Sequence, residues 1–314
     1  MIEIVNLENA KVSNRTYGED TDIFPKEGII YNGEHYLVKY PSDSQSLITG
    51  EQRHFTIQLN EYLGSQIYNI LGVSVQETIL GIRRGQLVCA CKDFTEHNQL
   101  VKVGTLIREK DEELKELLEE RVHTKKIEID QALERYFINF EYNHYFKEIE
   151  GLIDRFWEIQ LLDILINNND RHFMNWGVLK DSEGRMTLAP LFDNGMCLYT
   201  NIREDIIIEL LSDTQQLYSS ALEGVTIYLA VKFTENYLSN ITLQKAILKL
   251  VPLFEERMQK IYDFIDSLPE YYRLEDNTTI EVCTKNRKEI YKKILQIRLD
   301  IILKPMYEKV LELQ

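Results

Sequence analysis

The chain has 314 residues, of which 44% are hydrophobic and 28% are charged, as is typical of a folded globular protein. Thirty-six basic and 51 acidic residues give a formal net charge of −15, which disfavours direct binding to nucleic acid or to an anionic membrane. No apolar run is long enough to span a bilayer, no signal peptide begins the chain, and the four cysteines form no zinc-binding pattern. We therefore expect a cytoplasmic protein in which any phosphate site is a local basic pocket.

The first part of the chain, residues 1–97, has the pattern of strands around a single helix. Asn32-Gly33 is a strong hairpin signal between two apolar stretches, and Gly72 follows a helical apolar pattern as a helix-ending glycine. The predicted strands and helix cover, in chain order, 28–31, 36–40, 52–71 (the helix), 73–82 and 86–91. We expect a small, β-rich lobe with one main helix.

Beyond residue 97 the pattern is mainly helical. The stretch 108–121 is rich in Glu/Lys pairs, so we expect a solvated surface helix there, with a docking arm as the less favoured alternative. Two helices are predicted over 132–166 and further helices at 243–268 and 287–313, with strands at 176–180 and 185–188. Pro305 is expected to interrupt the last helix. Because no linker is visible, we place the boundary between residues 1–97 and 98–314 at the change from strands to helices.

A polar stretch at 168–175, Asn-Asn-Asp-Arg-His-Phe-Met-Asn, follows an apolar segment that has the pattern of a buried helix. After the predicted strand pair comes Phe-Asp-Asn-Gly at 192–195. Phosphoryl transfer to a hydroxyl needs one carboxylate to receive the hydroxyl and its proton, and an amide oxygen and a second carboxylate to hold magnesium. Asp170, Asn175 and Asp193 supply these groups in that order, with the four-residue gap of kinase catalytic loops.

The spacing of Asp170 and Asn175 does not decide the function by itself, since about one or two Asp-x4-Asn pairs arise by chance in a chain of this length. The alternative is a polar loop in which Asp170 caps the next segment, and Asp163, two helical turns earlier, is open as a cap or a support. The order of elements favours catalysis, because buried helix, polar loop, hairpin and Asp-x-Gly turn follow one another as in the larger lobe of a kinase. We therefore predict a bilobal, protein-kinase-like α+β fold.

Two residues of the small lobe complete this hypothesis. Lys39 ends an apolar strand, where a lysine would contact nucleotide phosphates, and Glu61 in the following helix would hold its flexible stem. Solvated surface positions are the alternative for both residues, and their coincidence with Asp170 favours the functional interpretation. His172 is expected to support the active site without transferring the proton, because Asp170 already supplies the base. Arg171 is expected to pair with a nearby carboxylate.

The remaining nucleotide contacts carry little side-chain signal. We assign the adenine of ATP to the segment 89–94, where Lys92 and Phe94 would bind the cofactor through the backbone. Upstream of the strand lysine there is no glycine-rich phosphate loop. The candidates for that loop are 15–18 and the stretch through Lys26.

Two segments of the chain resemble a known family. Asn-x-Asp-Arg-His-x-x-Asn at 168–175, followed by Ala-Pro-Leu-Phe-Asp-x-Gly at 189–195, resembles the C-terminal kinase core of the HipA-type bacterial serine/threonine kinases. Asn-Glu-Tyr at 60–62, followed by Leu-Gly-Val-Ser-Val at 71–75, is similar to the helix-to-strand segment of the same family. The resemblance runs over about residues 36–199.

This resemblance implies an ATP- and Mg²⁺-dependent kinase that transfers the γ-phosphate to a protein hydroxyl. It implies Asp170 as the catalytic base, Asn175 and Asp193 as magnesium ligands, and Lys39 as the phosphate-binding lysine. Family analogy also suggests a translation component as the protein substrate and an antitoxin or other regulatory protein as a partner. We further predict autophosphorylation in the N-terminal loop, which holds Ser13, Thr16 and Thr21.

HipA proteins usually carry an additional N-terminal subdomain, whereas this chain begins close to its first kinase-like strands, so a short, CtkA-like form is expected. Two alternatives remain open. One is a small-molecule kinase with the same catalytic loop, which turnover of a small acceptor would favour. The other is an inactive kinase fold that serves as an interaction module, for example in a toxin–antitoxin pair, which a lack of Mg²⁺–ATP turnover would favour.

Overall fold

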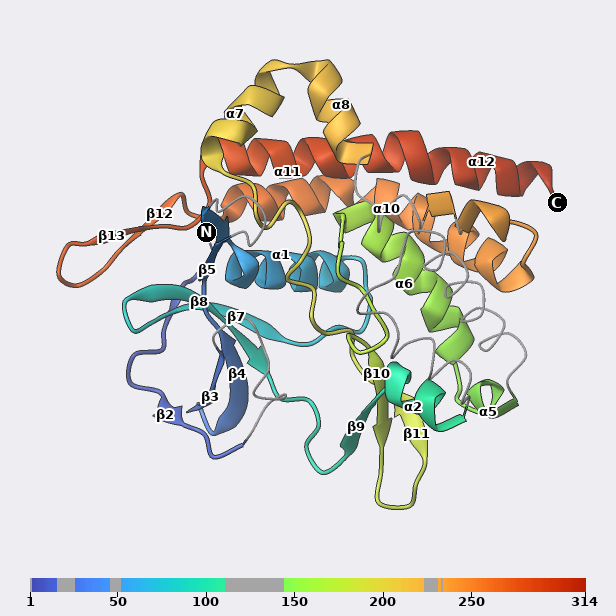
Figure 1. Ribbon diagram of the computed structural model, residues 1–314, viewed down its shortest axis with the longest axis horizontal. Coiled ribbons are helices and arrows are strands. Elements are labelled where there is room, and N and C mark those ends of the chain that lie inside the picture. The colour runs from blue at the N-terminus through green and yellow to red at the C-terminus, as the bar shows by residue number, and fades with distance from the viewer. Residues whose placement is uncertain (1, 16–25, 46–51, 111–143, 223–230, 233) are drawn as a thin grey trace.

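The computed structural model describes residues 2–15, 26–45, 52–110, 144–222, 231–232 and 234–314. A curled sheet with one long helix against it forms the smaller part of the protein, and packed helices form the larger part (Figure 1). The predicted α+β fold, with a β-rich small lobe and a mostly helical large lobe, is therefore confirmed. The boundary at residue 97 stays a prediction; the next strand, β9 (Gln99–Lys102), pairs with β10 (Gly177–Lys180) of the large lobe.

Six strands form the sheet of the small lobe, in the order β1-β7-β8-β4-β3-β2. Their bounds are β1 Val5–Asn6, β2 Lys11–Val12, β3 Lys26–Tyr31, β4 Glu34–Lys39, β7 Thr78–Arg83 and β8 Gln86–Lys92. The hairpin predicted at Asn32-Gly33 is confirmed, and a second hairpin joins the next two strands. Asn32 and Gly33, with φ of 49° and 84°, join β3 to β4, and Arg84 and Gly85, with φ of 52° and 68°, join β7 to β8.

The N-terminal segment closes this sheet on itself. β1 and β2 pair at opposite edges of the sheet although four residues, 7–10, separate them in the chain, so the sheet must curl to bring its edges together. Leu7 is fully buried in the curl, among apolar side chains of β3, β4 and β8. Arg83 fixes the segment by donating its Nη1 to the carbonyl oxygens of Leu7 and Ala10, at 2.8 and 3.1 Å.

Helix α1 (Ile57–Ile70) lies between β7 and β8 of the sheet and helix α10 (Ile241–Ser267) of the large lobe. Its start differs from the prediction, because residues 52–55 are not helical. They form strand β6 (Gln52–Phe55), which pairs with β5 (Ser42–Gln45). Pairing with the preceding strand overrides the apolar spacing that predicted a longer helix. The end is as predicted, with Gly72 at φ 74°.

The large lobe consists mainly of helices. Those in the described residues are α2 Val103–Lys110, α5 His144–Lys147, α6 Leu152–Ile166, α7 Glu204–Ser212, α8 Thr214–Leu222, α10 Ile241–Ser267, α11 Lys285–Arg298 and α12 Lys304–Glu312. Helix α6 packs against α10 and α11 and leads directly into the polar stretch at 168–175 (Figure 1). Most of the charged helix predicted at 108–121, and residues 132–143 of the next prediction, lie outside the described residues. Across the described ranges, no helix combines the length and apolar content needed to cross a bilayer.

Short strands and one helix interruption complete the lobe. The strand pair predicted at 176–188 is confirmed as β10 and β11 (Met186–Leu188), whereas β9 and the hairpin of β12 (Tyr271–Arg273) with β13 (Thr279–Glu281) were missed. Strands of three or four residues are too short to show a period of two, so the sequence carries no signal for them. The predicted interruption near Pro305 is confirmed as a π-helical turn, Leu299–Leu303, between α11 and α12.

Candidate active site

A cleft of about 670 Å³ lies between the curled sheet and the large lobe. It is lined by Asn14, Arg15, Lys26, Leu37, Lys39, Gln76, Cys91, Asp93, Phe94, Thr95, Glu96, Leu100, Lys102, Met174, Phe192 and Asp193. Four of these residues are basic and three are acidic, whereas the whole chain carries a net charge of −15. The cleft therefore gathers cationic side chains of the kind that contact phosphate groups.

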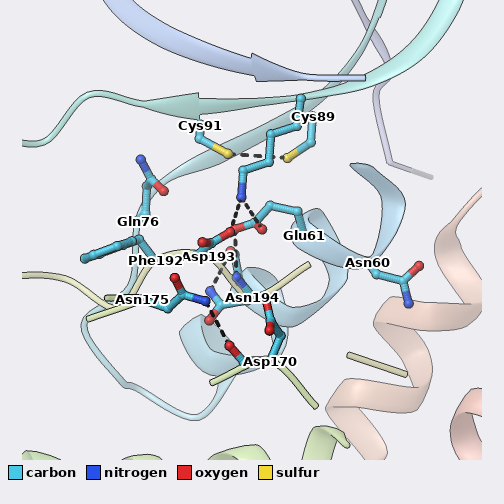
Figure 2. A network of polar contacts seen from close by, with 12 residues as sticks. Asn60, Glu61, Gln76, Cys89, Cys91, Asp170, Asn175, Phe192, Asp193 and Asn194 are labelled. Atoms are coloured by element: carbon cyan, nitrogen blue, oxygen red, sulfur yellow. Dashed lines mark hydrogen bonds and ion pairs between the residues drawn. The ribbon is translucent and has the colours of Figure 1, made fainter. Parts of the chain in front are cut away.

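Lys39 and Asp193 line this cleft, and Lys39 is bonded to both Asp193 and the buried Glu61. Figure 2 shows the side chains of Glu61 and Asp193 turned toward each other. The Nζ of Lys39, at the end of β4, donates to Oε2 of Glu61 and to Oδ1 of Asp193, each at 2.7 Å. Lys39 is 6% exposed and Glu61 is fully buried, whereas the side chain of Asp193 is 41% exposed. The structure thus joins the lysine and glutamate of the small lobe to the aspartate of the large lobe in one network.

The charges in this network stabilise one another. Burial opposes the charge on Lys39, but attraction by Asp193 and Glu61 outweighs it and raises the pKa of the ammonium well above its ordinary value. Burial likewise opposes ionisation of Asp193, but the charge and hydrogen bond of Lys39 hold the pKa of that carboxyl well below its usual range. Both groups are therefore ionised at neutral pH.

The turn at 193–195 is pressed against helix α1. The N–H of Asn194 donates to Oε1 of Glu61 at 3.1 Å, so both oxygens of that carboxylate are used within the site. A Cβ on Gly195 would lie 2.6 Å from Cγ1 of Ile57, which only glycine avoids. Asp193 has φ of 61°, a left-handed conformation that aspartate tolerates better than most residues. These contacts fix Asp193 relative to Lys39.

Asp170 and Asn175 lie on the loop between α6 and β10. The Nδ2 of Asn175 donates to the backbone oxygen of Asp170 at 2.9 Å, which closes the loop. Asp170 is exposed at the surface, yet desolvation by the surrounding chain, with a smaller contribution from the charge of Asp193, raises the pKa of its carboxyl. Desolvation also lowers the pKa of His172, whose Nδ1 accepts the N–H of Met174 at 3.2 Å, so a neutral imidazole shapes the turn of this loop.

Arg171 connects the two polar loops from the inside. Its Nε and Nη2 donate to the carboxylate of Asp163 at 2.9 and 3.3 Å, and both side chains are 6% exposed. Its Nη1 donates to the backbone oxygens of Asn175 and Phe192 at 2.8 and 2.7 Å, and its Nη2 also donates to Oδ1 of Asn194 at 2.5 Å. The expected pairing with a carboxylate is confirmed, and one guanidinium fixes both loops relative to each other.

The chain that follows the Phe-Asp-Asn-Gly turn is held by α1. The Nδ2 of Asn60 donates to the backbone oxygens of Cys197 and Leu198 at 2.6 and 3.3 Å, inside the protein. At the start of the helix, the N–H of Thr56 donates to the oxygen of Thr200 at 2.8 Å. The helix that carries Glu61 is therefore fastened to the chain that carries Asp193.

Asn60→Ala is expected to lower the free energy of unfolding by roughly 1–3 kcal/mol, because two buried carbonyl groups lose their donor. Since Asn60 precedes Glu61 in the same helix, we also expect slower phosphate transfer. Urea unfolding and a transfer assay measure the two effects. Asn69→Ala, at an exposed position of α1, is the matched control and should change neither quantity measurably. Equal stability of both variants would contradict the role given to Asn60.

Helix α11 supports the loops from behind. Arg298 is fully buried and donates to the backbone oxygen of Ile164 at 2.8 Å and to Oδ1 of Asn167 at 2.6 Å, at the end of α6. Burial lowers the pKa of Arg298 to about 10, so its charge remains at neutral pH and faces the negative end of the helix dipole. Nearer the start of α11, Arg287 donates to the backbone oxygen of Ile202 at 2.9 Å.

Of the two residues assigned to the nucleotide base, the side chain of Phe94 lies in the cleft and that of Lys92 lies outside it. Phe94 lines the cleft, and its ring centroid is 5.8 Å from that of Phe192. Lys92 does not line the cleft. Its Nζ lies 3.7 and 3.8 Å from the carboxylates of Glu34 and Glu77, because strand alternation turns it to the face opposite its cleft-lining neighbour. The structure therefore does not bring the Lys92 side chain to the site.

The candidate phosphate loop lies largely outside the described residues, together with the predicted threonine phosphorylation sites, because 16–25 are not described. The residues on either side of this segment, Arg15 and Lys26, both line the cleft. Ser13 is 8% exposed, and its Oγ lies 2.8 Å from Nδ1 of His35.

Several cleft residues carried no signal in the sequence. Gln76, Asp93 and Lys102 line the cleft from three different segments, and Arg15 forms an ion pair with Asp93. None of them belongs to a local motif, and only the strand order and the curl of the sheet bring them together. Asp163 and Asn194, which hold Arg171, were likewise not predicted as site residues.

The residues present fit a divalent metal that is shared with phosphate groups. Within the described part of the chain, no group of three or more His, Cys, Asp or Glu side chains could hold a metal ion by itself. Mg²⁺ in kinases takes one or two protein oxygens and completes its shell with phosphates and water. Asp193 offers an ionised, partly exposed carboxylate. Because Nδ2 of Asn175 is committed to Asp170, its Oδ1 is left to accept a ligand.

Comparison with known proteins places this geometry in a family. A family model described as the HipA-like C-terminal domain matches residues 23–211. The serine/threonine-protein kinase CtkA of Helicobacter pylori strain J99 is 31% identical over 255 residues, which cover 78% of this chain and 73% of that protein. The chain belongs to the HipA-like kinase family.

The structure of this HipA-like kinase is similar to a solved one along its whole length. The crystal structure of a Helicobacter pylori proinflammatory kinase CtkA matches with a TM-score of 0.70 and 24% identity, and the match covers 99% of both chains. The resemblance stated from the sequence is thereby confirmed. The protein is a phosphotransferase of the HipA-type serine/threonine kinases and, as a kinase, uses a nucleotide and a divalent metal.

Proposed function

We propose that this HipA-like kinase transfers the γ-phosphate of ATP, in the presence of Mg²⁺, to serine or threonine hydroxyls of a protein. The observation that carries the proposal is the network of Lys39 with Glu61 and Asp193, in which Lys39 and Asp193 line the cleft. Arg171 ties this network to the loop of Asp170. A phosphate-binding lysine, metal-binding oxygens and a carboxylate base are the groups that phosphoryl transfer to a hydroxyl requires.

Asp170 is the proposed catalytic base. Its carboxylate is exposed, so a substrate hydroxyl can reach it, and its raised pKa favours proton acceptance over that of an ordinary aspartate. It would take the hydroxyl proton while the hydroxyl oxygen bonds to the γ-phosphorus of ATP and the bond from that phosphorus to the β,γ-bridging oxygen breaks, so that ADP leaves. His172, neutral and bonded to the Met174 N–H, keeps the shape of the loop.

Lys39 is the proposed phosphate-binding residue, and Glu61 positions it. The lysine is charged, almost fully buried and held by two carboxylates, so little side-chain entropy remains to be lost on binding phosphate oxygens. Asn175 and Asp193 would hold Mg²⁺, which neutralises the charge that develops on the phosphates. Phe94 would bind the nucleotide base.

We further propose autophosphorylation in the N-terminal loop. Arg15 and Lys26, at the two ends of the segment 16–25, both line the cleft, so that segment begins and ends at the site. Thr16 and Thr21 are the favoured acceptors. Ser13 is the less favoured acceptor, because it is 8% exposed and hydrogen-bonded to His35.

The proposed setting follows from charge and family. A net charge of −15 favours basic protein substrates and disfavours direct contact with nucleic acid or a membrane surface. By family analogy we propose a translation component as substrate, an antitoxin or other regulatory protein as partner, and the cytoplasm as location.

Incubation of the purified chain with γ-labelled ATP and a basic protein tests the function. With Mg²⁺ we expect label on serine or threonine of the added protein and of the chain itself; with excess EDTA we expect none, and added Mg²⁺ should restore it. Label only on a small-molecule acceptor would favour a small-molecule kinase. Nucleotide binding without any transfer would favour an inactive interaction module.

A further inference from the structure

We propose that Gln76 makes the cleft selective for purines with an amino group at position 6. This inference rests on the proposed nucleotide-binding function. Gln76 lies between α1 and β7, is half-buried and lines the cleft. Its N–H donates to the backbone oxygen of Leu191 at 2.8 Å, which fixes its backbone to the large lobe next to Phe192. In Figure 2 its side chain stands beside Phe192, at the edge of the site that holds Asp193.

The orientation of the Gln76 carboxamide follows from its hydrogen-bond partner. Its Nε2 lies 2.8 Å from the backbone oxygen of Lys92. Because a carbonyl oxygen can only accept, the amide must present its nitrogen there, and Oε1 remains as an acceptor. Within the described residues, Oε1 of Gln76 has no hydrogen-bond partner. The glutamine therefore offers the cleft an acceptor of fixed direction.

The neighbouring backbone supplies a donor. In the described part of the chain, neither the N–H nor the C=O of Phe94 makes a hydrogen bond. The N–H of Lys92, by contrast, donates to the backbone oxygen of Glu77 at 2.8 Å. At this edge of the cleft, within the described residues, the N–H of Phe94 is available as a donor and Oε1 of Gln76 as an acceptor. Gln76 is held there by its bond to the oxygen of Lys92, two residues before Phe94. A 6-aminopurine has the matching order, an accepting N1 beside a donating amino group. A 6-oxopurine has the reverse order and would turn an acceptor toward Oε1.

Paired titrations of the full chain with ATP and ITP, in the presence of Mg²⁺, test this assignment. ITP carries oxygen at position 6 and hydrogen at N1. We expect wild-type protein to bind ATP about tenfold more tightly than ITP. Gln76→Met keeps the length of the side chain but removes the acceptor, and should reduce this preference to about threefold or less. Isothermal calorimetry measures both dissociation constants.

Gln66→Met is the matched control. Gln66 is a half-buried glutamine of α1 outside the cleft lining, with Nε2 3.5 Å from Oγ1 of Thr78, and its substitution should leave the ATP/ITP preference unchanged. An unchanged preference in Gln76→Met overturns the inference while leaving the proposed function intact. No binding of either nucleotide to the wild type overturns both.

A second measurement needs no variant and covers the case in which Gln76→Met does not fold. Purine riboside triphosphate lacks only the 6-amino group of ATP, so wild-type protein should bind it several-fold more weakly than ATP. Equal affinities would show that nothing in the cleft accepts a hydrogen bond from the amino group, and the assignment of Gln76 would be wrong.

Discussion

Asp193→Asn is expected to slow phosphate transfer by at least about 10³-fold, because the loss of metal-held charge stabilisation costs several kcal/mol in the transition state. The substitution keeps the size of the side chain and removes the negative charge. Lys39 retains Glu61 as a partner at 2.7 Å, so the small lobe should keep its arrangement. Initial rates with γ-labelled ATP and thermal unfolding measure the two quantities.

Asp205→Asn serves as the control for this variant, because Asp205 is an exposed residue of α7 that pairs with Arg203 and does not line the cleft. Its rate should equal that of the wild type. Metal-free ADP should bind Asp193→Asn about as well as wild type, which separates lost chemistry from a lost fold. If Asp193→Asn kept more than about a tenth of the wild-type rate, the aspartate could not be an essential metal ligand.

Arg171→Met is expected to lower the free energy of unfolding by about 3–5 kcal/mol, because it leaves the buried carboxylate of Asp163 without its charge partner. The hydroxyl of Tyr68 and Nδ2 of Asn168 would still donate to Asp163, at 2.7 and 3.0 Å, but neither carries a charge. The variant also releases both loops that Arg171 joins, so kcat/KM should fall about 10²-fold through misplacement of Asp170. Urea unfolding and steady-state kinetics measure these effects.

A double substitution separates stability from positioning. Asp163→Asn combined with Arg171→Met removes both buried charges, so part of the lost stability should return, whereas the rate should stay low because the loops remain untied. Arg185→Met is the surface control. Its pair with Asp181 is 74% exposed on the arginine side, and its loss should cost less than about 1 kcal/mol. A normal rate in the folded double variant would refute the positioning role of Arg171.

The groups of the candidate site could be located from the sequence because they lie in short local patterns. Asp170, Asn175 and Asp193 are recognisable by type, order and spacing, and the strand before Lys39 is marked by the Asn-Gly hairpin. The sequence also predicted that Arg171 pairs with a carboxylate. It did not identify Asp163 as that carboxylate, because the pairing depends on how the loop after α6 folds back against the helix.

Other features depend on contacts between distant segments, and no local pattern encodes them. Strand β9, at residues 99–102, pairs with β10, at residues 177–180, and its own residues show no strand pattern. Lys92 and Phe94 were assigned together as backbone contacts to adenine, which stays a prediction, and of their side chains only that of Phe94 lines the cleft. Gln76 is held at the cleft by a backbone hydrogen bond to Leu191, which lies in a distant part of the chain.

The family match ends at residue 211, but the support of the site does not. Arg287 and Arg298, on α11, reach back to Ile202 and to the end of α6. A shortened enzyme cut after residue 211 would retain each proposed reactive side chain and lose the two buried cations that brace them. We therefore expect the smallest active form of this protein to include helix α11.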